Sequence, residues 1–393
     1  MPFHRRQLIT AGAIFLLGIV LFGLGIQFPK GHDFDEFHQV PEAKELLDGR
    51  LERPIAQPPL SRYLVAASIA ADADRPFGWR WIGVVFGGLA LAGIYFWALA
   101  LFHENQTALW AVGLAAVNGL LYVQSRIAMP DTFLITFLVW ALALFTLFWS
   151  PGLSRRRARR LLTGSGILFG LALATKWSAL APWFTCLGLF GMVRLLQRWE
   201  ARFGHASPWH ERMPGHRDWY SPSLWSNLKD RVFWIHLGLI PMGVYVLSFL
   251  PLFLLKSSNV TLGDFWSLQM DILNTHLQPK PGHPYASAWY EWPLMLKPIW
   301  YAFDKEGAGQ AWVRGVVLLG NPLVLWPGLA AVAFSAWAWV RHRSQSGFLI
   351  TILFLCLWMT WVVIPAKGTF FYHYIPAALV LGLGLTYAGH AVS

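Results

Sequence analysis

The sequence predicts an all-α polytopic membrane protein, and three observations carry that prediction. Hydrophobic residues make up 56% of the chain and charged residues only 13%, which is far from the composition of an ordinary soluble domain. Apolar runs of about 20 residues, the length that a helix needs to cross the ~30 Å hydrocarbon core, recur along the whole chain. The excess of Lys and Arg over Asp and Glu lies on one side of the membrane that these runs imply. We therefore expect a single transmembrane domain over residues 1–393 with about ten spans.

The first expected span is a helix that we predict to be retained. The apolar run that follows the two N-terminal arginines is long for a secretory signal, and no small-residue cleavage site follows it. The spans are expected at 8–28, 78–102, 107–124, 131–149, 161–176, 177–197, 232–255, 312–340, 347–364 and 373–391. Within them, Gly83 with Gly87 and Gly166 with Gly170 form small-residue pairs at four-residue spacing, which indicates close helix packing.

The net charge has a topological explanation. With the N-terminus in the cytoplasm, the inner segments hold the whole formal excess of +11, because positive and negative residues balance on the outer side. The strongest cluster is the arginine run at 155–160, as the positive-inside rule requires. Nucleic-acid binding is therefore not needed to explain the basic character. Cys186 and Cys356 both fall inside expected spans and are predicted to be inert residues of the core.

Three segments between the spans are long. The inner loop 198–231 carries tryptophans among charges, which is typical of a segment anchored at headgroup level. The outer segments 29–77 and 256–311 are where we expect function to concentrate. Within the first of them, Glu36 to Asp48 and Leu60 to Ala71 have helical spacing but are too short to span, so we predict helices that lie in the interface.

Two neighbouring acids, Asp35 and Glu36, open the first outer segment. Neighbouring side chains on a helix diverge by ~100°, so this pair cannot easily act as the two opposed carboxylates of a glycoside hydrolase. A transfer reaction with a good leaving group needs only one base, and Asp35 can be that base with Glu36 as a support. The alternative is a solvated start or cap of a helix.

Several cations lie at the outer ends of the expected spans. Charge is costly inside lipid and is therefore usually functional or paired. Together these side chains are expected to hold an anionic lipid headgroup, with Arg offering bidentate contacts to phosphate and Lys a point charge. They are Arg80, Arg126, Lys176 and Lys367. An ion pair between Arg126 and Asp131 is the structural alternative for one of them.

Histidines and aromatic residues suggest two further kinds of site on the outer side. His276, His283 and His373 could join the acids around a metal, but no pair of them has the usual ligand spacing. We therefore expect no required cofactor, while the pattern leaves room for a divalent cation. The string from His283 to Tyr285, with the tryptophans that follow, could line a sugar pocket, although an aromatic belt at the interface is the default reading.

Several short strings occur in a defined order between residues 33 and 377. They are Asp35-Glu36-Phe37-His38, Gln57-Pro58-Pro59-Leu60, Gln124-Ser125-Arg126-Ile127-Ala128-Met129-Pro130-Asp131, Ala174-Thr175-Lys176-Trp177-Ser178, His283-Pro284-Tyr285, Gly320-Asn321-Pro322 and Phe371-Tyr372-His373-Tyr374. Together they resemble the motifs of the protein O-mannosyltransferases, a family of GT-C-fold glycosyltransferases that use a polyprenyl-phosphate sugar donor. The chain is thus expected to have the GT-C fold.

The resemblance implies a function and a role for individual residues. Asp35 would take the proton from a Ser or Thr hydroxyl of an acceptor protein, Arg80 and Arg126 would steady the donor phosphate, and Glu36 would help to place a substrate. Lys176 and Lys367 would also face the phosphate, and the substrate pocket would include Asp131, His283, Tyr285 and His373.

The reaction implied is an inverting transfer of mannose from polyprenyl-phosphate mannose. It would take place at the outer face of the plasma membrane, with the donor lipid, an acceptor protein or peptide and membrane lipids as partners. We expect no nucleic-acid partner, and the protein could form an oligomer.

This sequence also departs from the family pattern. Gln57 stands where the family has His, the β-trefoil domain of eukaryotic members is missing from the large outer segment, and the chain ends soon after the expected tenth span. We therefore expect a bacterial-type or truncated member. The alternatives are a GT-C transferase that moves another lipid-linked sugar to a lipid or glycan, and a transporter or non-catalytic membrane subunit. A transporter would place its coupling charges near mid-membrane, and a non-catalytic subunit would tolerate Asp35→Asn.

Overall fold

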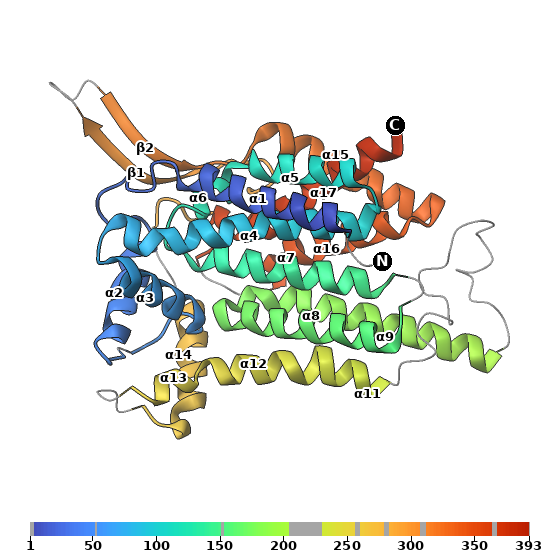
Figure 1. Cartoon of the computed structure of the whole chain (residues 1–393), viewed down its shortest axis with the longest axis horizontal. Helices are drawn as coiled ribbons and strands as arrows, with labels where there is room; N and C mark the ends of the chain where they lie inside the picture. The colour runs from blue at the N-terminus through green and yellow to red at the C-terminus, as the bar shows by residue number, and fades with distance from the viewer. Residues whose placement is uncertain are drawn as a thin grey trace.

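The computed structural model is a bundle of long helices that lie side by side, with short helices gathered at one end (Figure 1). It describes residues 4–51, 53–150, 153–203, 230–255, 260–278, 283–306, 312–363 and 368–392. Within these residues, eight helical segments are long and apolar enough to cross a membrane. The chain is therefore a multi-pass membrane protein, as the composition predicts.

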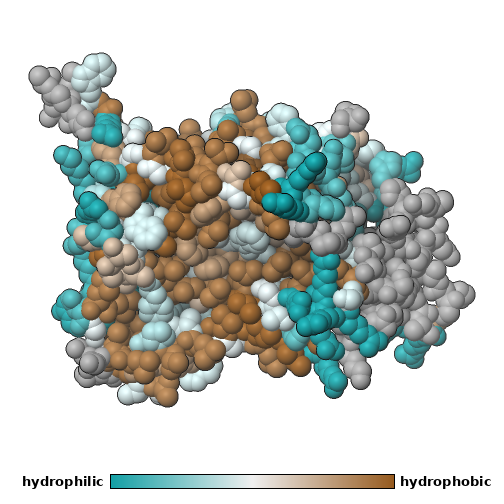
Figure 2. All heavy atoms as spheres, viewed as in Figure 1, coloured by the Kyte–Doolittle hydropathy of each residue, from teal (hydrophilic) through white to brown (hydrophobic). Residues whose placement is uncertain are grey.

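The eight segments contain most of the long helices. They comprise α1 (Arg5–Gly23), α4 (Pro76–Phe102), α7 (Pro130–Phe148), a 3₁₀ turn at Trp177–Ala179 with α9 (Leu180–Phe203), α11 (Asp230–Phe233) with a π-helix at Trp234–Leu239, α12 (Ile240–Ser248) and α13 (Leu250–Phe253), α15 (Pro322–His342), α16 (Gln345–Val363), and a 3₁₀ turn at Phe371–Tyr374 with α17 (Ile375–Val392). A broad hydrophobic band covers the middle of the bundle, and hydrophilic residues lie toward its two ends (Figure 2).

The expected count of about ten spans is not confirmed. Two of the expected runs do not form a helix that is both long enough and apolar enough to cross a membrane. The run at 107–124 is divided into α5 (Asn105–Ala116) and α6 (Gly119–Gln124). The division occurs at Asn118, whose side chain accepts a hydrogen bond from the Leu120 N–H and so begins a new helix.

The second differing run, 161–176, forms the C-terminal part of α8 (Arg155–Thr175). This helix is long enough to cross a membrane, but its first turns carry the arginine cluster, which makes the helix as a whole less apolar than the eight segments. It nevertheless packs against α7 and α12 within the bundle.

A β-hairpin is the element that the sequence analysis missed. β1 (Ile299–Glu306) pairs antiparallel with β2 (Trp312–Leu318) and projects from the end of the bundle that carries α2 and α3 (Figure 1). The fold is mostly helical, as predicted, and the hairpin is an addition to it. The expected span at 312–340 is corrected, because α15 begins only at Pro322. A short apolar run rich in valine is compatible with either a helix or a strand, and the β-branched residues favour the strand.

The two short helices predicted in the first outer segment are confirmed as helices. They are α2 (Glu36–Leu47) and α3 (Leu60–Asp72), which pack against each other. The second outer segment contributes α14 (Phe265–Leu277), preceded by a 3₁₀ turn at Leu262–Asp264. An ion pair of 2.7 Å between Arg53 and Asp271 joins the two outer segments.

The small-residue pairs lie where helices approach closely, as predicted. A Cβ atom at Gly166 would overlap the carbonyl oxygen of His236, and one at Gly170 would lie 2.6 Å from Cβ of Val244. A Cβ atom at Gly87 would lie 2.5 Å from the Ser125 hydroxyl oxygen. These glycines thus allow α8 to contact the π-helix and α12, and α4 to contact the segment before α7.

Gly166→Ala is expected to destabilise the protein, because the added methyl group meets backbone that cannot move independently. Overpacking of this kind costs about 1–3 kcal/mol. The matched control is Gly188→Ala, since no atom lies within 4 Å of a Cβ atom at that position in α9. The melting temperature in detergent should fall for Gly166→Ala and not for Gly188→Ala. If the Gly166→Ala and Gly188→Ala proteins melt at the same temperature, the close contact between Gly166 and the His236 backbone is contradicted.

Candidate active site

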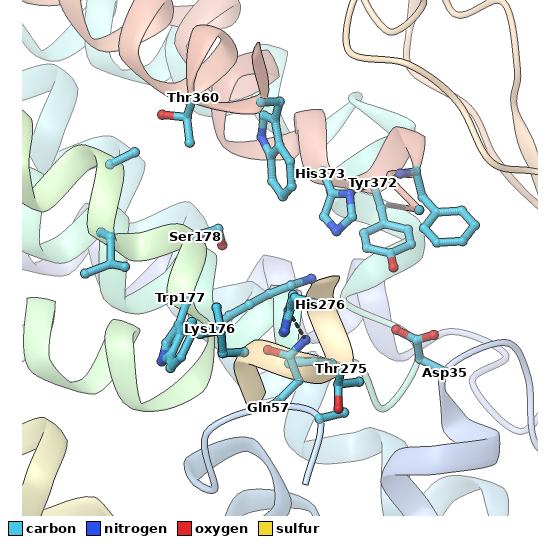
Figure 3. Close-up of a pocket in the computed structure, with 18 of the residues that line it drawn as sticks. Asp35, Gln57, Lys176, Trp177, Ser178, Thr275, His276, Thr360, Tyr372 and His373 are labelled. Atoms are coloured by element: carbon cyan, nitrogen blue, oxygen red, sulfur yellow. Dashed lines mark hydrogen bonds between the residues drawn. The ribbon is translucent and has the colours of Figure 1, made fainter. Parts of the chain in front are cut away.

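A cavity of about 1460 Å³ lies at the end of the bundle that carries the short helices. Its walls come from the first outer segment, the start of α9, the ends of α14 and α16, and the segment at 368–373. The sequence-predicted site residues that line it are Asp35, Lys176, His283 and His373. Figure 3 shows several of the lining side chains, which reach the cavity from separate parts of the chain.

Glu36 is fully buried and forms a bidentate ion pair with Arg80. The Arg80 Nε and Nη2 atoms donate to the two carboxylate oxygens of Glu36 at 2.8 and 2.6 Å. The backbone N–H groups of Ala128 and Asp33 donate to the same carboxylate at 2.9 and 3.1 Å. Charge-assisted bonds in this fork geometry are among the strongest in proteins, so Glu36 joins the start of α2 to α4 and to the segment before α7.

The remaining donors of Arg80 are also satisfied by the protein. Its Nη1 atom donates to the carbonyl oxygens of Ile26 and Pro29 at 3.0 and 2.7 Å, and its Nη2 atom donates to that of Gly31 at 2.9 Å. A guanidinium has five N–H donors, and here each of them has a partner. Arg80 has no exposed surface and does not line the cavity. That Arg80 contacts the donor phosphate stays a prediction, and this geometry gives it no donor directed into the cavity.

Asp35 faces away from Glu36, as the helical spacing predicts. It occupies the N-cap position of α2 and lines the cavity. The residue before it, Phe34, has a left-handed backbone with a φ of 45°, a conformation that is strained for a residue with a bulky side chain. The Phe34 ring stacks on Tyr301 at a centroid distance of 4.6 Å, and this contact helps to hold the turn that aims Asp35.

Lys176 stands at the break between α8 and α9 and is held by Asp131. Its Nζ atom lies 3.0 Å from each carboxylate oxygen of Asp131, and both side chains are buried. The ammonium group also lies 4.9 Å from the centroid of the Tyr372 ring. Asp131 is in the first turn of α7, where the helix dipole favours a negative charge. The ion pair thus fixes a cation in the cavity wall.

The other predicted site residues are placed differently. Arg126 does not pair with Asp131, because its Nη1 atom donates to the Phe22 carbonyl oxygen at 3.0 Å, and it does not line the cavity. Tyr285 is also absent from the lining residues, and Lys367 lies outside the described residues. The structure therefore brings Lys176 to Asp35's cavity but neither Arg80 nor Arg126.

Both predicted histidines in the lining contact aromatic rings. His373 stacks on Trp361 at a centroid distance of 4.2 Å, and His283 meets the Phe370 ring edge-on at 4.9 Å. Among the residues that the structure describes, no group of three or more His, Cys, Asp or Glu side chains is arranged to hold a metal. That the protein needs no cofactor stays a prediction.

Part of the cavity wall is not among the predicted site residues. Gln57 and His276 line it and lie within hydrogen-bonding distance, although they are 219 positions apart. Only the contact between the two outer segments brings them together. The one signal in the sequence is Gln57 itself, because the similar family motif has His at this position.

Comparison with known proteins identifies the family of the chain. Residues 14–257 match the family model described as dolichyl-phosphate-mannose-protein mannosyltransferase. Residues 261–392 match the model of the C-terminal four-transmembrane region of protein O-mannosyltransferase. Two family models that follow each other along the chain therefore account for nearly all of it.

Among curated proteins, two similar relatives are both named polyprenol-phosphate-mannose–protein mannosyltransferase. The one from Mycobacterium tuberculosis (strain ATCC 25618 / H37Rv) is 26% identical over 98% of this chain and 81% of its own length. The one from Mycolicibacterium smegmatis (strain MKD8) is 27% identical over 90% of this chain and 75% of its own length.

Solved structures show the same fold. The S. cerevisiae protein O-mannosyltransferase Pmt1–Pmt2 complex bound to the sugar donor matches with a TM-score of 0.74 at 13% identity, over 99% of this chain and 85% of that chain. ArnT from Cupriavidus metallidurans bound to undecaprenyl phosphate matches with a TM-score of 0.63 at 13% identity, over 98% of this chain and 60% of that chain. The expected GT-C architecture is thereby confirmed.

Arg80→Lys is expected to destabilise the protein, although the charge is kept. An ammonium group has three donors and no fork, so buried carbonyl groups near Arg80 would lose their partner at a cost of about 2–4 kcal/mol. The matched control is Arg75→Lys, because Arg75 forms an exposed ion pair with Asp72 and exposed pairs contribute little. Thermal melting should separate the two variants, and an Arg80→Lys protein as stable as Arg75→Lys would refute the anchoring role.

Asp33→Asn is expected to stabilise the protein in a pH-dependent way. Burial, with the nearby Glu36 carboxylate as the second cause, raises the pKa of Asp33 from 3.8 to about 7. Because the pKa of Asp33 is higher in the folded than in the unfolded protein, the folded state is favoured at low pH. This stability is lost as the pH rises toward the pKa of the folded state. The neutral Asn avoids this loss, on the order of 2–4 kcal/mol.

The gain in melting temperature of Asp33→Asn over the wild type should therefore grow between pH 5 and pH 8. The control is Asp48→Asn, because Asp48 is exposed. A gain that is the same at both pH values would show that Asp33 does not titrate in this range.

Proposed function

The chain belongs to the dolichyl-phosphate-mannose-protein mannosyltransferase family, and from this premise we propose that it transfers mannose from a polyprenyl-phosphate mannose donor to Ser or Thr hydroxyl groups of proteins. The observation that carries the proposal is a cavity whose lining includes Asp35 and Lys176 together with apolar side chains from two membrane-length helices. Such a cavity suits a substrate that joins a long hydrocarbon chain to a phosphate and a sugar.

One part of the cavity wall, here called the apolar arm, consists of apolar side chains of α9 and α16, which contact each other. It is lined by Leu180, Ala181, Phe184, Met359 and Val363. Both helices belong to segments long and apolar enough to span a membrane. A polyprenyl chain could therefore enter the arm directly from the hydrocarbon layer and lose its apolar surface to similar surroundings.

Lys176 is the cation that this proposal assigns to the donor phosphate. Two of its three N–H donors are directed to Asp131, which leaves one for a phosphate oxygen. Because the ion pair fixes the ammonium group before the donor arrives, little reorganisation is needed as negative charge grows on the leaving phosphate. His373, on the opposite wall from Gln57 in Figure 3, is a further candidate for contact with the donor.

Asp35 is the general base of the proposed reaction. Its carboxylate accepts the proton of the acceptor hydroxyl while the hydroxyl oxygen forms a bond to the anomeric carbon of mannose. The bond between that carbon and the phosphate oxygen breaks, and its electron pair leaves with polyprenyl phosphate. Attack from the side opposite the leaving group inverts the anomeric configuration. Glu36 is buried with Arg80 and takes no direct part, and the proposed steps use no cofactor.

We place this chemistry on the extracytoplasmic side of the plasma membrane. The arginine-rich start of α8 lies at the end of the bundle opposite α2 and α3 (Figure 1). Positively charged segments favour the cytoplasmic side, so the end that carries the cavity would face outward. An acceptor protein would then reach Asp35 from the aqueous side and the donor from the membrane.

Asp35→Asn is expected to reduce transfer by a factor of about 10²–10⁴, because the amide cannot accept the proton. The measurement is transfer of radiolabelled mannose from polyprenyl-phosphate mannose to a Ser/Thr-rich peptide by the purified full chain in detergent. Donor binding and melting temperature should remain those of the wild type, and the control Asp48→Asn should keep its activity.

Two outcomes would overturn parts of this proposal. Full activity of Asp35→Asn would remove Asp35 from the role of base. A wild type that binds the donor lipid but transfers no mannose to any peptide would reject protein mannosylation, and the search would turn to another sugar or to a lipid or glycan acceptor.

A further inference from the structure

Gln57 and His276 form a neutral pair in the cavity wall. The Gln57 Nε2 and His276 Nε2 atoms are 3.3 Å apart, and the His276 Nδ1 atom lies 2.8 Å from the Ile272 carbonyl oxygen. Because a carbonyl oxygen only accepts hydrogen bonds, Nδ1 carries the ring proton of the neutral imidazole. The Nε2 atom of His276 therefore accepts from the Gln57 amide, which fixes the orientation of that amide.

This orientation leaves the amide oxygen of Gln57 in need of a partner. The Oε1 atom is buried and accepts no hydrogen bond from the residues that the structure describes. A buried acceptor without a donor costs about 1–3 kcal/mol, so such atoms usually have a partner in the working protein. In the wall of a substrate cavity, an O–H or N–H group of a ligand can supply that donor.

The pair is held in place from both outer segments. The Arg53–Asp271 ion pair joins the chain just before Gln57 to the helix that carries His276. The His276 ring also lies parallel to the Trp177 ring, at a centroid distance of 6.3 Å and an interplanar angle of 16°. The amide is thus positioned before any ligand binds, which lowers the entropy lost on binding.

The position of the pair relative to Lys176 indicates which part of a substrate it meets. Trp177, which stacks on His276, is the residue directly after Lys176. Gln57, His276, Lys176 and Asp35 all line the same cavity, and Figure 3 shows Asp35 to one side of the other three. In the donor, the sugar is bonded directly to the phosphate. Its ring hydroxyls therefore lie no farther from the phosphate site than the length of one sugar ring. A neutral amide is suited to hydroxyl groups rather than to the phosphate itself.

We propose that Gln57, positioned by His276, binds a ring hydroxyl of the transferred sugar and contributes to the choice of that sugar. The hydroxyl donates to Oε1 of Gln57, and the second amide N–H of Gln57 can donate to a neighbouring hydroxyl oxygen. Gln57 is the specificity residue, and His276 is a positioning residue that acts through it. This inference rests on the proposed function, since it takes the sugar phosphate to be the donor.

The first test measures binding and needs no turnover. Purified wild type and Gln57→Ala are titrated with polyprenyl-phosphate mannose and, separately, with polyprenyl phosphate. Gln57→Ala should weaken binding of the mannosyl lipid roughly tenfold, about 1.4 kcal/mol, and leave binding of polyprenyl phosphate unchanged. Equal effects on both lipids, or no effect on either, would overturn the proposal.

Matched variants separate a positioning role from general damage. His276→Ala should show the same lipid-selective loss, and His276→Gln should restore part of it, because a Gln side chain can again accept from Gln57. Gln278→Ala and His342→Ala remove the same residue types at exposed positions and should bind both lipids as the wild type does. A His276→Ala protein with normal binding of the mannosyl lipid would exclude the positioning role.

The second test uses transfer kinetics with donors in which single ring hydroxyls are replaced by hydrogen. The wild type should lose roughly tenfold in kcat/KM with one of these deoxy donors. Gln57→Ala should show that loss with the intact donor and no further loss with the same deoxy donor, while the KM of the acceptor peptide stays constant. A raised peptide KM with donor discrimination intact would instead assign the pair to the acceptor.

These outcomes are distinct from failure of the proposed function. If the wild type transfers no mannose, protein mannosylation is rejected, but the difference in binding between the two lipids still decides whether Gln57 contacts the sugar.

Discussion

The arrangement of the site depends on the buried ion pair between Glu36 and Arg80. Removing two charges from water is costly unless every donor and acceptor is satisfied, and this pair meets that condition with three carbonyl groups and two backbone N–H groups. The pair therefore fixes the chain before α2, the start of α2, α4 and the segment before α7 relative to one another. Asp35, one residue earlier, points away from the pair and faces the cavity.

Much of this arrangement can be predicted from local patterns. Apolar length predicts most of the spans, because it depends on the bilayer rather than on particular contacts. The orientation that the charge distribution indicates stays a prediction. The divergence of Asp35 from Glu36 follows from helical geometry alone, and the structure confirms it. The small-residue pairs likewise predicted close packing, because only a glycine leaves room for a neighbouring backbone.

The roles of the cations could not be predicted in the same way. A sequence shows that Arg80 and Lys176 stand at the ends of helices, but their partners are 44 and 45 positions away. Arg80 is enclosed by carbonyl groups that only the folded chain collects, whereas Lys176 remains at the cavity wall. The pairing of Gln57 with His276 and the β-hairpin also depend on contacts between distant segments, which no local periodicity records.

The most direct measurement of this account is a structure of the full chain with polyprenyl-phosphate mannose bound. The account predicts that the phosphate contacts Lys176, that the polyprenyl chain lies between α9 and α16, and that the Glu36–Arg80 pair is unchanged. A phosphate bound to Arg80, with the carbonyl groups of Ile26, Pro29 and Gly31 displaced, would contradict the account. That result would return Arg80 to the role that its position in the sequence suggested.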